Sequence, residues 1–242
     1  MKIAAYNLRA GGRRGERVHW QRLLEAFAPE IMLIQETSHP SQYLPAKTYA
    51  ANAKRIHWLA APGRQWGSAI YVRAGRLTPL TLPCYPGHIV AAEVTGSAWT
   101  RRTGRPLRIA SLHVPAPYKR PMNEILDYFA TLPATHDWIL GGDFNLAVGV
   151  RHANEPIPSD PPWLLQRLRR EFNLLSCWQA VHPNRDLAQT LRWSGNPAAP
   201  YHCDGVFVPA GWYQYLEDCQ VIADPTWDVL SDHNPVVVTL AT

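Results

Sequence analysis

The sequence predicts an α/β fold built on packed sheets. Short apolar, β-prone segments alternate with amphipathic helical segments along all 242 residues, with no internal repeat and no break in composition. This mixture is typical of a layered α/β domain rather than of two separate modules. With 46% hydrophobic residues, the chain can also supply a substantial core. We therefore expect residues 1–242 to form one domain.

The N-terminal part begins with a strand, a helix and a second strand. Residues 2–6 and 31–35 are short apolar segments bounded by polar residues, which predicts buried strands. Between them, apolar residues recur at helical spacing from Val18 to Phe27, and Pro29 follows the helix end. A strand–helix–strand unit usually makes its two strands parallel neighbours.

The rest of the chain continues this alternation. Further strands are predicted at residues 69–73, 88–95, 107–114, 138–140, 205–208 and 235–240. Residues 101–105 have the composition of a turn and predict a hairpin between two of these strands. Amphipathic helices are predicted around residues 122–129 and 163–172.

Charge and cysteine content exclude few classes of protein. The formal net charge of +5 favours polyanionic partners but is also ordinary for a globular protein. The four cysteines show neither a CxxC pair nor zinc-ligand spacing, so we expect free and mostly buried thiols. No segment has the character of a signal peptide or of a bilayer span, which predicts a cytoplasmic protein with no membrane partner.

Five polar positions, spread in order along the chain, each follow a short apolar segment. They are Asn7, Glu36, His113, Asp143 with Asn145, and Asp232 with His233. Strand ends on one rim of a sheet can bring such distant groups to one point. Carboxylates and amides suit a hard cation such as Mg²⁺, and histidines suit proton transfer or contact with an anion. The pattern predicts a metal-assisted phosphodiesterase.

These positions lie in segments that resemble the endonuclease/exonuclease/phosphatase superfamily, in the order of that family and along almost the whole chain. The segments are Tyr6–Arg9, Ile34–Thr37, Gly67–Ile70, Ser111–His113, Gly141–Asn145, Cys203–Phe207 and Ser231–Pro235. The resemblance implies a two-layer β-sandwich of mixed sheets flanked by helices (four layers, α/β/β/α) and Mg²⁺-dependent phosphoester cleavage, with Mn²⁺ as a substitute. The chain resembles both pancreatic deoxyribonuclease and nucleases of the exonuclease and abasic-site endonuclease type. At Arg9 and His113 it resembles pancreatic deoxyribonuclease more than the abasic-site endonucleases.

The resemblance and the chemistry of phosphodiester hydrolysis together imply a metal site. Glu36 is the expected central ligand, with Asn7 beside it, and Asp232 is expected to reach the metal directly or through water. The alternative for Glu36 is an ordinary ion pair at a strand end.

The remaining positions imply catalytic roles. Asp143 is expected to accept the proton of the attacking water or to orient that water, and Asn145 to contact the water or a phosphoryl oxygen. His233 is expected to bind the phosphoryl group as a cation, with Asp204 holding its other ring nitrogen. His113 is expected to donate a proton to the leaving oxygen or to hydrogen-bond the phosphate. The plain alternatives are a turn at Asp143, a capped loop at His233 and a core histidine at His113.

Substrate contacts are expected from residues beside these positions. Arg9 either reaches a substrate phosphate or pairs with a nearby acid. Arg192 and Trp193 lie in a segment that resembles one ahead of the Asp204 strand in the family, and are expected to contact substrate, with core packing as the alternative for Trp193.

Several loops combine cationic and aromatic residues, as nucleic-acid surfaces do. These are Arg13, Arg14 and Arg17 near Trp20, Arg64 near Trp66, and Lys119 and Arg120 near Tyr118. Solvated loops around buried aromatic rings are the alternative interpretation.

Three functions are compatible with the pattern. The favoured one is a nuclease that hydrolyses DNA and needs no obligate protein partner. The second is a phosphoesterase of the same fold acting on an inositol phosphate, a phospholipid or a nucleotide. A lipid-directed enzyme should have an exposed apolar hairpin, for which residues 77–85 are the nearest candidate. A catalytically inactive binding module is poorly supported, because every expected catalytic position is occupied.

Overall fold

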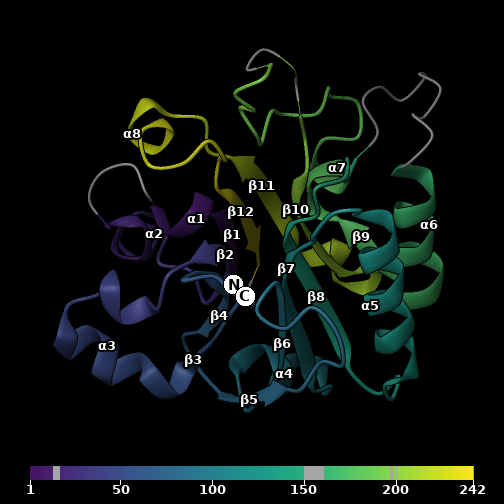
Figure 1. Ribbon diagram of the computed structural model, residues 1–242. Helices are drawn as coiled ribbons and strands as arrows, with labels where there is room; N and C mark the ends of the chain where they lie inside the picture. Colours follow the sequence, from purple (N-terminus) through teal and green to yellow (C-terminus); the bar gives the residue numbers. More distant parts are fainter. Residues whose placement is uncertain (13–16, 150–160, 197–198, 200, 242) are drawn as a thin grey trace.

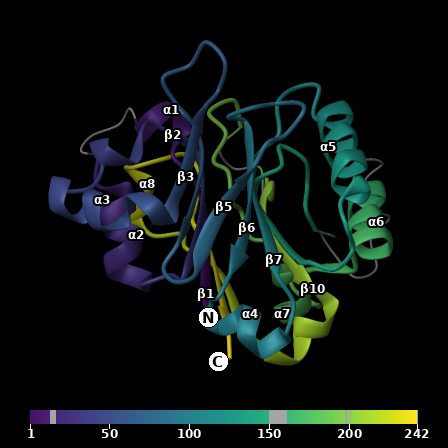
Figure 2. The same cartoon turned by 90° about the horizontal axis from the view of Figure 1, so that it is seen from below.

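Two six-stranded sheets pack face to face, with helices on both outer faces (Figure 1). The computed structural model describes residues 1–12, 17–149, 161–196, 199 and 201–241. Figure 2 shows the layers end-on, with α2, α3 and α8 on one side of the sheets and α5 and α6 on the other. The predicted four-layer α/β/β/α architecture is confirmed.

The first sheet combines the two ends of the chain. Its strands, in spatial order, are β11 (Leu216–Val221), β12 (Val236–Leu240), β1 (Lys2–Asn7), β2 (Ile31–Thr37), β4 (Gly67–Val72) and β3 (Ile56–Ala60). β1 runs parallel to β2, as the strand–helix–strand order predicts, and antiparallel to β12. The carboxyl ends of β1 and β2 therefore lie at one rim of the sheet, beside the loop that leads into β12.

The second sheet is formed by the middle of the chain. Its strands, in spatial order, are β5 (Arg76–Leu80), β6 (Ile89–Thr95), β7 (Leu107–His113), β8 (Asp137–Asp143), β10 (Asp204–Pro209) and β9 (Leu174–Ser176). β7 and β8 are parallel, whereas β10 is antiparallel to β8. The carboxyl ends of β7 and β8 consequently lie beside the start of β10.

The helices cover the outer faces of the sheets or close their ends. They are α1 (Arg9–Gly12), α2 (His19–Phe27), α3 (Ala46–Asn52), α4 (Ala98–Thr103), α5 (Lys119–Thr131), α6 (Pro161–Phe172), α7 (Cys177–Val181) and α8 (Pro225–Asp228). Short 3-10 turns occur at Pro40–Gln42, Ala53–Arg55 and Ala210–Tyr215. None of the helices in the described residues is long and apolar enough to cross a bilayer.

Three apolar clusters hold the layers together. The central cluster lies between the sheets and contains Ile3 and Leu33 of the first sheet and Ile109 and Ile139 of the second. A second cluster joins α5 and α6 to the second sheet, and a third joins α2 to the first sheet. Successive side chains of a strand point to opposite faces, and nearly all residues of β1 and β2 are buried. Both faces of these two strands are therefore covered. This rigid packing fixes the strand ends that carry the polar positions.

The strands β6 and β7 pair antiparallel, as the predicted hairpin requires, but the turn predicted at residues 101–105 was wrong. The connection between β6 and β7 contains helix α4, which begins after Ser97 and ends before Gly104. The Ser97 hydroxyl accepts a hydrogen bond of 3.1 Å from the Thr100 backbone N–H, and Gly104 takes a left-handed conformation (φ 67°). These are standard helix-ending features. The buried side chain of Trp99 anchors the helix to the central core, so packing favours a helix over a tight turn.

Candidate active site

The predicted polar positions meet where the two sheets share one rim. In the second sheet, Asp143 at the end of β8 is the direct neighbour of both His113 on β7 and Asp204 on β10. In the first sheet, Asn7 aligns with Gln35, next to Glu36. We use the name candidate active site for this rim, with the residues Asn7, Glu36, His113, Asp143, Asn145, Asp204, Asp232 and His233.

Asn7 connects the two sheets. Its Nδ2 donates hydrogen bonds to Oε1 of Glu36, at 3.2 Å, and to Oδ2 of Asp143, at 2.9 Å. Its Oδ1 accepts a hydrogen bond of 2.8 Å from the Arg9 backbone N–H. The glutamate of the first sheet and the aspartate of the second are therefore held by one buried amide, although Asn7 and Asp143 are 136 residues apart.

Glu36 lies between the sheets at the end of β2. Its Oε2 accepts a hydrogen bond of 2.6 Å from the Ala10 backbone N–H, and its Oε1 lies 3.4 Å from Nε2 of His113. The His113 ring packs against Trp66, with 5.4 Å between ring centroids. Glu36 is thus not in an unrelated surface ion pair, and His113 faces the site rather than the core.

Asp143 and Asn145 form a tight turn that presents the aspartate to the site. Oδ1 of Asp143 accepts a hydrogen bond of 2.8 Å from the Asn145 backbone N–H, and Nδ2 of Asn145 donates to the Val114 carbonyl at 3.0 Å. Gly142 has φ 131°, and a Cβ there would lie 2.3 Å from the Leu112 carbonyl oxygen. Only glycine fits this close approach of two backbones.

His233 and Asp204 form a buried ion pair. Nδ1 of His233 lies 2.9 Å from Oδ2 of Asp204, and its Nε2 lies 3.9 Å from Oδ2 of Asp143. Burial by itself lowers the pKa of His233, but the carboxylates of Asp204 and Asp143 raise that pKa, to about 10. The imidazole is therefore cationic at neutral pH, with one N–H fixed on Asp204.

Asp232 and Arg9 are paired beside this group. Nη1 of Arg9 lies 3.0 Å from Oδ2 of Asp232. The other carboxylate oxygen of Asp232, Oδ1, is buried and has no hydrogen-bond partner among the described residues. Of the two predictions for Arg9, pairing with a nearby acid is the one seen here, although its half-exposed side chain still reaches the surface.

The carboxylates of Glu36 and Asp232 fit a hard divalent cation, whereas the amide of Asn7 is turned the wrong way for ligation. Glu36 and Asp232 offer carboxylate oxygens, and the unpartnered Oδ1 of Asp232 is the type of atom that a cation would satisfy. Asn7 presents its amide hydrogens, not its oxygen, to Glu36 and Asp143. Ligation through Asn7 Oδ1 therefore requires the amide to turn over and to release the Arg9 N–H.

A second set of potential metal donors lies beside the first. Asp143, Cys203, Asp204 and His233 are all buried, and one donor atom from each lies within 4.8 Å of the others. Cys203 was not among the expected site residues; the prediction that it is a free, buried thiol is confirmed.

Backbone strain is concentrated at this rim. Arg9, Ala10, Glu36 and Asn145 all have positive φ, between 48° and 54°. Such conformations cost free energy for residues other than glycine, and they occur preferentially at functional sites. Here they turn Glu36, in the last residues of β2, and Asn145, just after β8, toward the candidate active site.

Sequence reasoning missed two serines that hold the site together. Ser231 Oγ donates to the Asn7 carbonyl oxygen at 2.8 Å and accepts from the His233 backbone N–H at 3.1 Å. Ser111 Oγ accepts from Gln35 Nε2 at 2.8 Å, between the two sheets. Both serines lie inside the segments that resemble the family. Their roles could not be predicted because the sequence does not show that they are buried next to these partners.

Arg192 and Trp193 border the site in different ways. Arg192 donates to Asn234 Oδ1 and to the Ser231 carbonyl oxygen, so its guanidinium holds the loop that carries His233. Trp193 is 51% exposed and packs edge-to-face against Tyr201, whose side chain is also exposed. The core alternative for Trp193 is therefore wrong, and the two rings form an open aromatic surface.

A polar hollow of about 530 Å³ adjoins the site on the side of Glu36. The backbone of residues 10–12 forms part of its wall, and the exposed side chains of Arg17 and Arg64 line it together with Trp66. The Arg64 guanidinium lies 5.7 Å from the centre of the Trp66 ring. Trp66 also contacts His113, so this ring borders both the hollow and the candidate active site.

The other predicted cationic and aromatic pairs are less well supported. Arg13 and Arg14 lie outside the described residues. Trp20 is fully buried and donates to the Thr37 hydroxyl, so its ring cannot stack on a base. Lys119 lies over Trp163 rather than Tyr118, and Arg120 pairs with Glu124.

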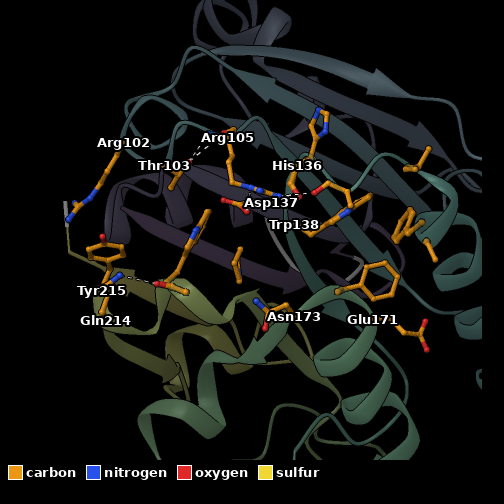
Figure 3. Close-up of a pocket in the computed structure, with 18 residues that line it drawn as sticks. Arg102, Thr103, Arg105, His136, Asp137, Trp138, Glu171, Asn173, Gln214 and Tyr215 are labelled. Carbon is orange, nitrogen blue, oxygen red and sulfur yellow. Dashed lines mark hydrogen bonds and ion pairs between the residues drawn. The ribbon is translucent and has the colours of Figure 1, made fainter.

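A larger hollow, of about 670 Å³, lies at the opposite end of β8 (Figure 3). Its lining includes Asp137, the first residue of β8, which is about 20 Å from Asp143 along the strand. Arg105 pairs with Asp137 at 2.9 Å, and the Arg102 guanidinium covers the Tyr215 ring at 4.2 Å. Arg105 and Arg102 thus already interact with neighbouring side chains, and none of the predicted site residues lines this hollow.

The comparisons with solved structures agree on the fold. The chain is similar to an AP endonuclease from Archaeoglobus fulgidus (TM-score 0.69, 16% identity, 100% of both chains covered). It is also similar to a 3′ phosphatase, NExo from Neisseria bound to a product DNA hairpin (TM-score 0.67, 20% identity, 100% of both chains). A third similar structure is the endonuclease domain of TRAS1, a telomere-specific non-LTR retrotransposon (TM-score 0.66, 18% identity, 100% of this chain and 98% of the other).

No curated protein sequence matches the chain significantly. The family model described as "Endonuclease/Exonuclease/phosphatase family" matches residues 4–233 and therefore includes every strand end of the candidate active site. Together with the two-sheet sandwich and the polar groups gathered at its rim, this match shows that the chain belongs to the endonuclease/exonuclease/phosphatase family.

Proposed function

We propose that this protein is a Mg²⁺-dependent phosphodiesterase that hydrolyses DNA. The observation that carries the proposal is the double hydrogen bond of Asn7 to Glu36 and Asp143, at 3.2 and 2.9 Å. These two hydrogen bonds hold the carboxylate of Glu36, a metal ligand in this proposal, close to the carboxylate of Asp143, the proton acceptor. The cationic His233 lies 3.9 Å from the same Asp143.

Glu36 and Asp232 are the residues that would hold the cation, with Asn7 as a further oxygen donor after its amide turns over. When bound, Mg²⁺ neutralises charge on the phosphoryl oxygens and makes the phosphorus easier to attack. The Ala10 N–H bond to Glu36 fixes one oxygen of this carboxylate and leaves Oε1 facing the site.

Asp143 acts on the attacking water. Its Oδ1 is occupied by the Asn145 N–H, and its Oδ2 is the oxygen that faces Asn7 and His233. Oδ2 is therefore the atom that accepts the proton of the water or orients it. The side chain of Asn145, half-buried on the same turn, is close enough to assist as a contact for the water or a phosphoryl oxygen.

His233 and His113 serve the phosphate from two sides. Because Nδ1 of His233 is held by Asp204, Nε2 is the N–H that binds a phosphoryl oxygen, and the raised pKa keeps this group charged. His113, held beside Glu36 and Trp66, is placed to hydrogen-bond the phosphate or to protonate the leaving oxygen.

The surroundings of the site favour a polynucleotide substrate. The hollow with Arg17 and Arg64 offers two exposed cations for phosphates that flank the scissile one, and the exposed rings of Trp193 and Tyr201 can stack on bases. The similar structures include an AP endonuclease and a 3′ phosphatase bound to a product DNA hairpin, which supports the same choice.

A side-by-side assay tests this function. Wild-type protein and the Asp143→Asn variant are compared, with Mg²⁺, on plasmid DNA, abasic-site duplex, RNA, a generic phosphodiester and inositol phosphates. We expect DNA cleavage by the wild type and its loss in the variant. Turnover restricted to soluble monoesters would instead support the second function considered above, a small-molecule phosphoesterase.

A further inference from the structure

We infer that the candidate active site also contains a separate inhibitory site for a soft divalent metal, with the thiol of Cys203 as its distinguishing ligand and Zn²⁺ as the metal it fits. Sγ of Cys203, one oxygen each of Asp143 and Asp204, and a ring nitrogen of His233 lie within 4.8 Å of one another. The inhibitory effect rests on the proposed function, because it assumes that Asp143 and His233 take part in hydrolysis.

The distances suit a small tetrahedral site. Around Zn²⁺, ligand atoms bound at about 2.0–2.3 Å lie about 3.3–3.8 Å apart. One separation already lies within this range and another is only slightly wider, since Cys203 Sγ lies 3.5 Å from Asp204 Oδ2 and His233 Nε2 lies 3.9 Å from Asp143 Oδ2. The widest separation in the group therefore has to shrink by about 1 Å, which side-chain rotation can supply.

The charges also favour a cation at this position. Asp143 and Asp204 are both buried, and His233 is the positive group that faces them. Cys203 and His233 each keep 6% of their surface exposed. On metal binding the thiol of Cys203 gives up its proton to solvent, and the imidazole ligates through a nitrogen that has lost its own.

The chemical nature of the donors separates this site from that of Mg²⁺. Glu36 and Asp232 offer oxygen atoms, which hard cations such as Mg²⁺ prefer, whereas a thiolate and an imidazole select Zn²⁺ and similar metals. A soft metal held by Cys203 would occupy Asp143 and His233 without displacing the cation at Glu36. Inhibition by Zn²⁺ should therefore persist when the Mg²⁺ concentration is raised.

Ligation can be tested directly with Cd²⁺, which gives an ultraviolet charge-transfer band when a thiolate binds it. Wild-type protein is titrated with Cd²⁺ and compared with three variants, Cys203→Ser, Cys203→Ala and Cys84→Ala. Serine replaces sulfur by oxygen at nearly constant size, and alanine serves as the second variant if serine disturbs folding. Cys84, the half-buried thiol outside the cluster, is the matched control for loss of an accessible cysteine.

We expect one equivalent of Cd²⁺ to produce the band in wild-type protein and in Cys84→Ala, and no band in either Cys203 variant. The Zn²⁺ concentration that halves DNA cleavage, relative to the zinc-free rate of each protein, should rise at least about tenfold in the Cys203 variants. A wild type without the band, or a band that survives loss of Cys203, would overturn the inference. A protein that shows the band but cleaves no phosphodiester would refute the proposed function and leave the metal site standing.

Discussion

The hydroxyl of Ser231 donates a hydrogen bond of 2.8 Å to the carbonyl oxygen of Asn7, 224 residues away in the sequence. The hydroxyl oxygen of Ser231 in turn accepts a hydrogen bond of 3.1 Å from the His233 backbone N–H. Ser231 therefore ties the loop that carries His233 to the strand that carries Asn7. This buried hydroxyl therefore helps to fix the position of His233 relative to Asn7.

Replacing Ser231 with alanine should reduce both stability and rate. The substitution leaves the Asn7 carbonyl and the His233 N–H buried without their partner, so we expect the free energy of unfolding to fall by about 1–3 kcal/mol. Displacement of His233 should lower kcat roughly tenfold or more. Urea unfolding and single-substrate kinetics measure the two effects. Ser97→Ala, which removes a helix cap on α4, is the control: it should lower stability and leave kcat unchanged.

Asp143→Asn and His233→Ala should abolish most of the activity. Each removes a group that handles the proton of the water or the phosphoryl charge, so kcat should fall by roughly 10²–10⁴. Both variants should keep a cooperative unfolding transition. Asp127→Asn, an exposed aspartate paired with Arg167 on α6, should behave as wild type. A rate close to wild type for either active-site variant would remove that residue from its assigned role.

Hydrolysis should require a divalent cation. Activity should disappear in excess EDTA and return with Mg²⁺ or Mn²⁺, because the phosphoryl charge has no other neutralising group of equal strength at the site. Glu36→Gln should raise the Mg²⁺ concentration needed for half-maximal rate, whereas Glu25→Gln, on the exposed face of α2, should not. Full turnover in excess chelator would contradict the metal assignment.

Arg17 and Arg64 should contribute to DNA binding through phosphates. Arg17→Ala and Arg64→Ala should each weaken binding to duplex DNA and reduce the slope of log affinity against log salt by about one. Fluorescence anisotropy over a salt series measures this slope. Arg101→Ala, an exposed arginine on α4 near the opposite end of the sheets, should leave the slope unchanged. Equal losses at all three positions would indicate a general charge effect and no specific hollow.

His202 should make the protein less stable in weak acid. Burial lowers the pKa of His202 from 6.5 to about 4. As pH falls below about 6.5, the unfolded chain binds a proton that the folded chain refuses, so the free energy of unfolding decreases down to about pH 4. The loss is of the order of 3 kcal/mol in full. Urea midpoints at about pH 7.5 and pH 5 should differ less in His202→Gln, which cannot titrate. An identical pH dependence in both proteins would exclude His202 as the cause.

The central strands could be predicted because their information is local. β1, β2, β7 and β8 have six or seven residues, most of them apolar or small and nearly all buried, and burial on both faces favours such segments. The edge strands β3, β5 and β11 mix polar and apolar residues, and Cys219 is the only one of their residues that is fully buried. They become strands because they form backbone hydrogen bonds with a neighbouring strand. The local sequence pattern carries no information about that neighbour.

The residues of the candidate active site could be predicted, but their contacts and the burial of their neighbours could be predicted only in part. Each of Asn7, Glu36, His113 and Asp143 follows an apolar segment, which places it at a strand end from sequence alone. The pairing of Arg9 with Asp232, the burial of Trp20 and the exposure of Trp193 were open or wrongly expected. Each of these depends on which surfaces face each other after the sheets pack.

The sequence by itself determined which chemical groups stand at the strand ends and in what order, because alternation and residue type are properties of the chain. Only the tertiary structure decided which groups touch. Asn7 meets Asp143, and Cys203 comes within reach of His233, because sheet register and face-to-face packing set distances between residues far apart in sequence. Those distances, and the placement of the Asp204 and Asp143 carboxylates that raise the pKa of His233 against the effect of burial, arise from the packing of the two sheets.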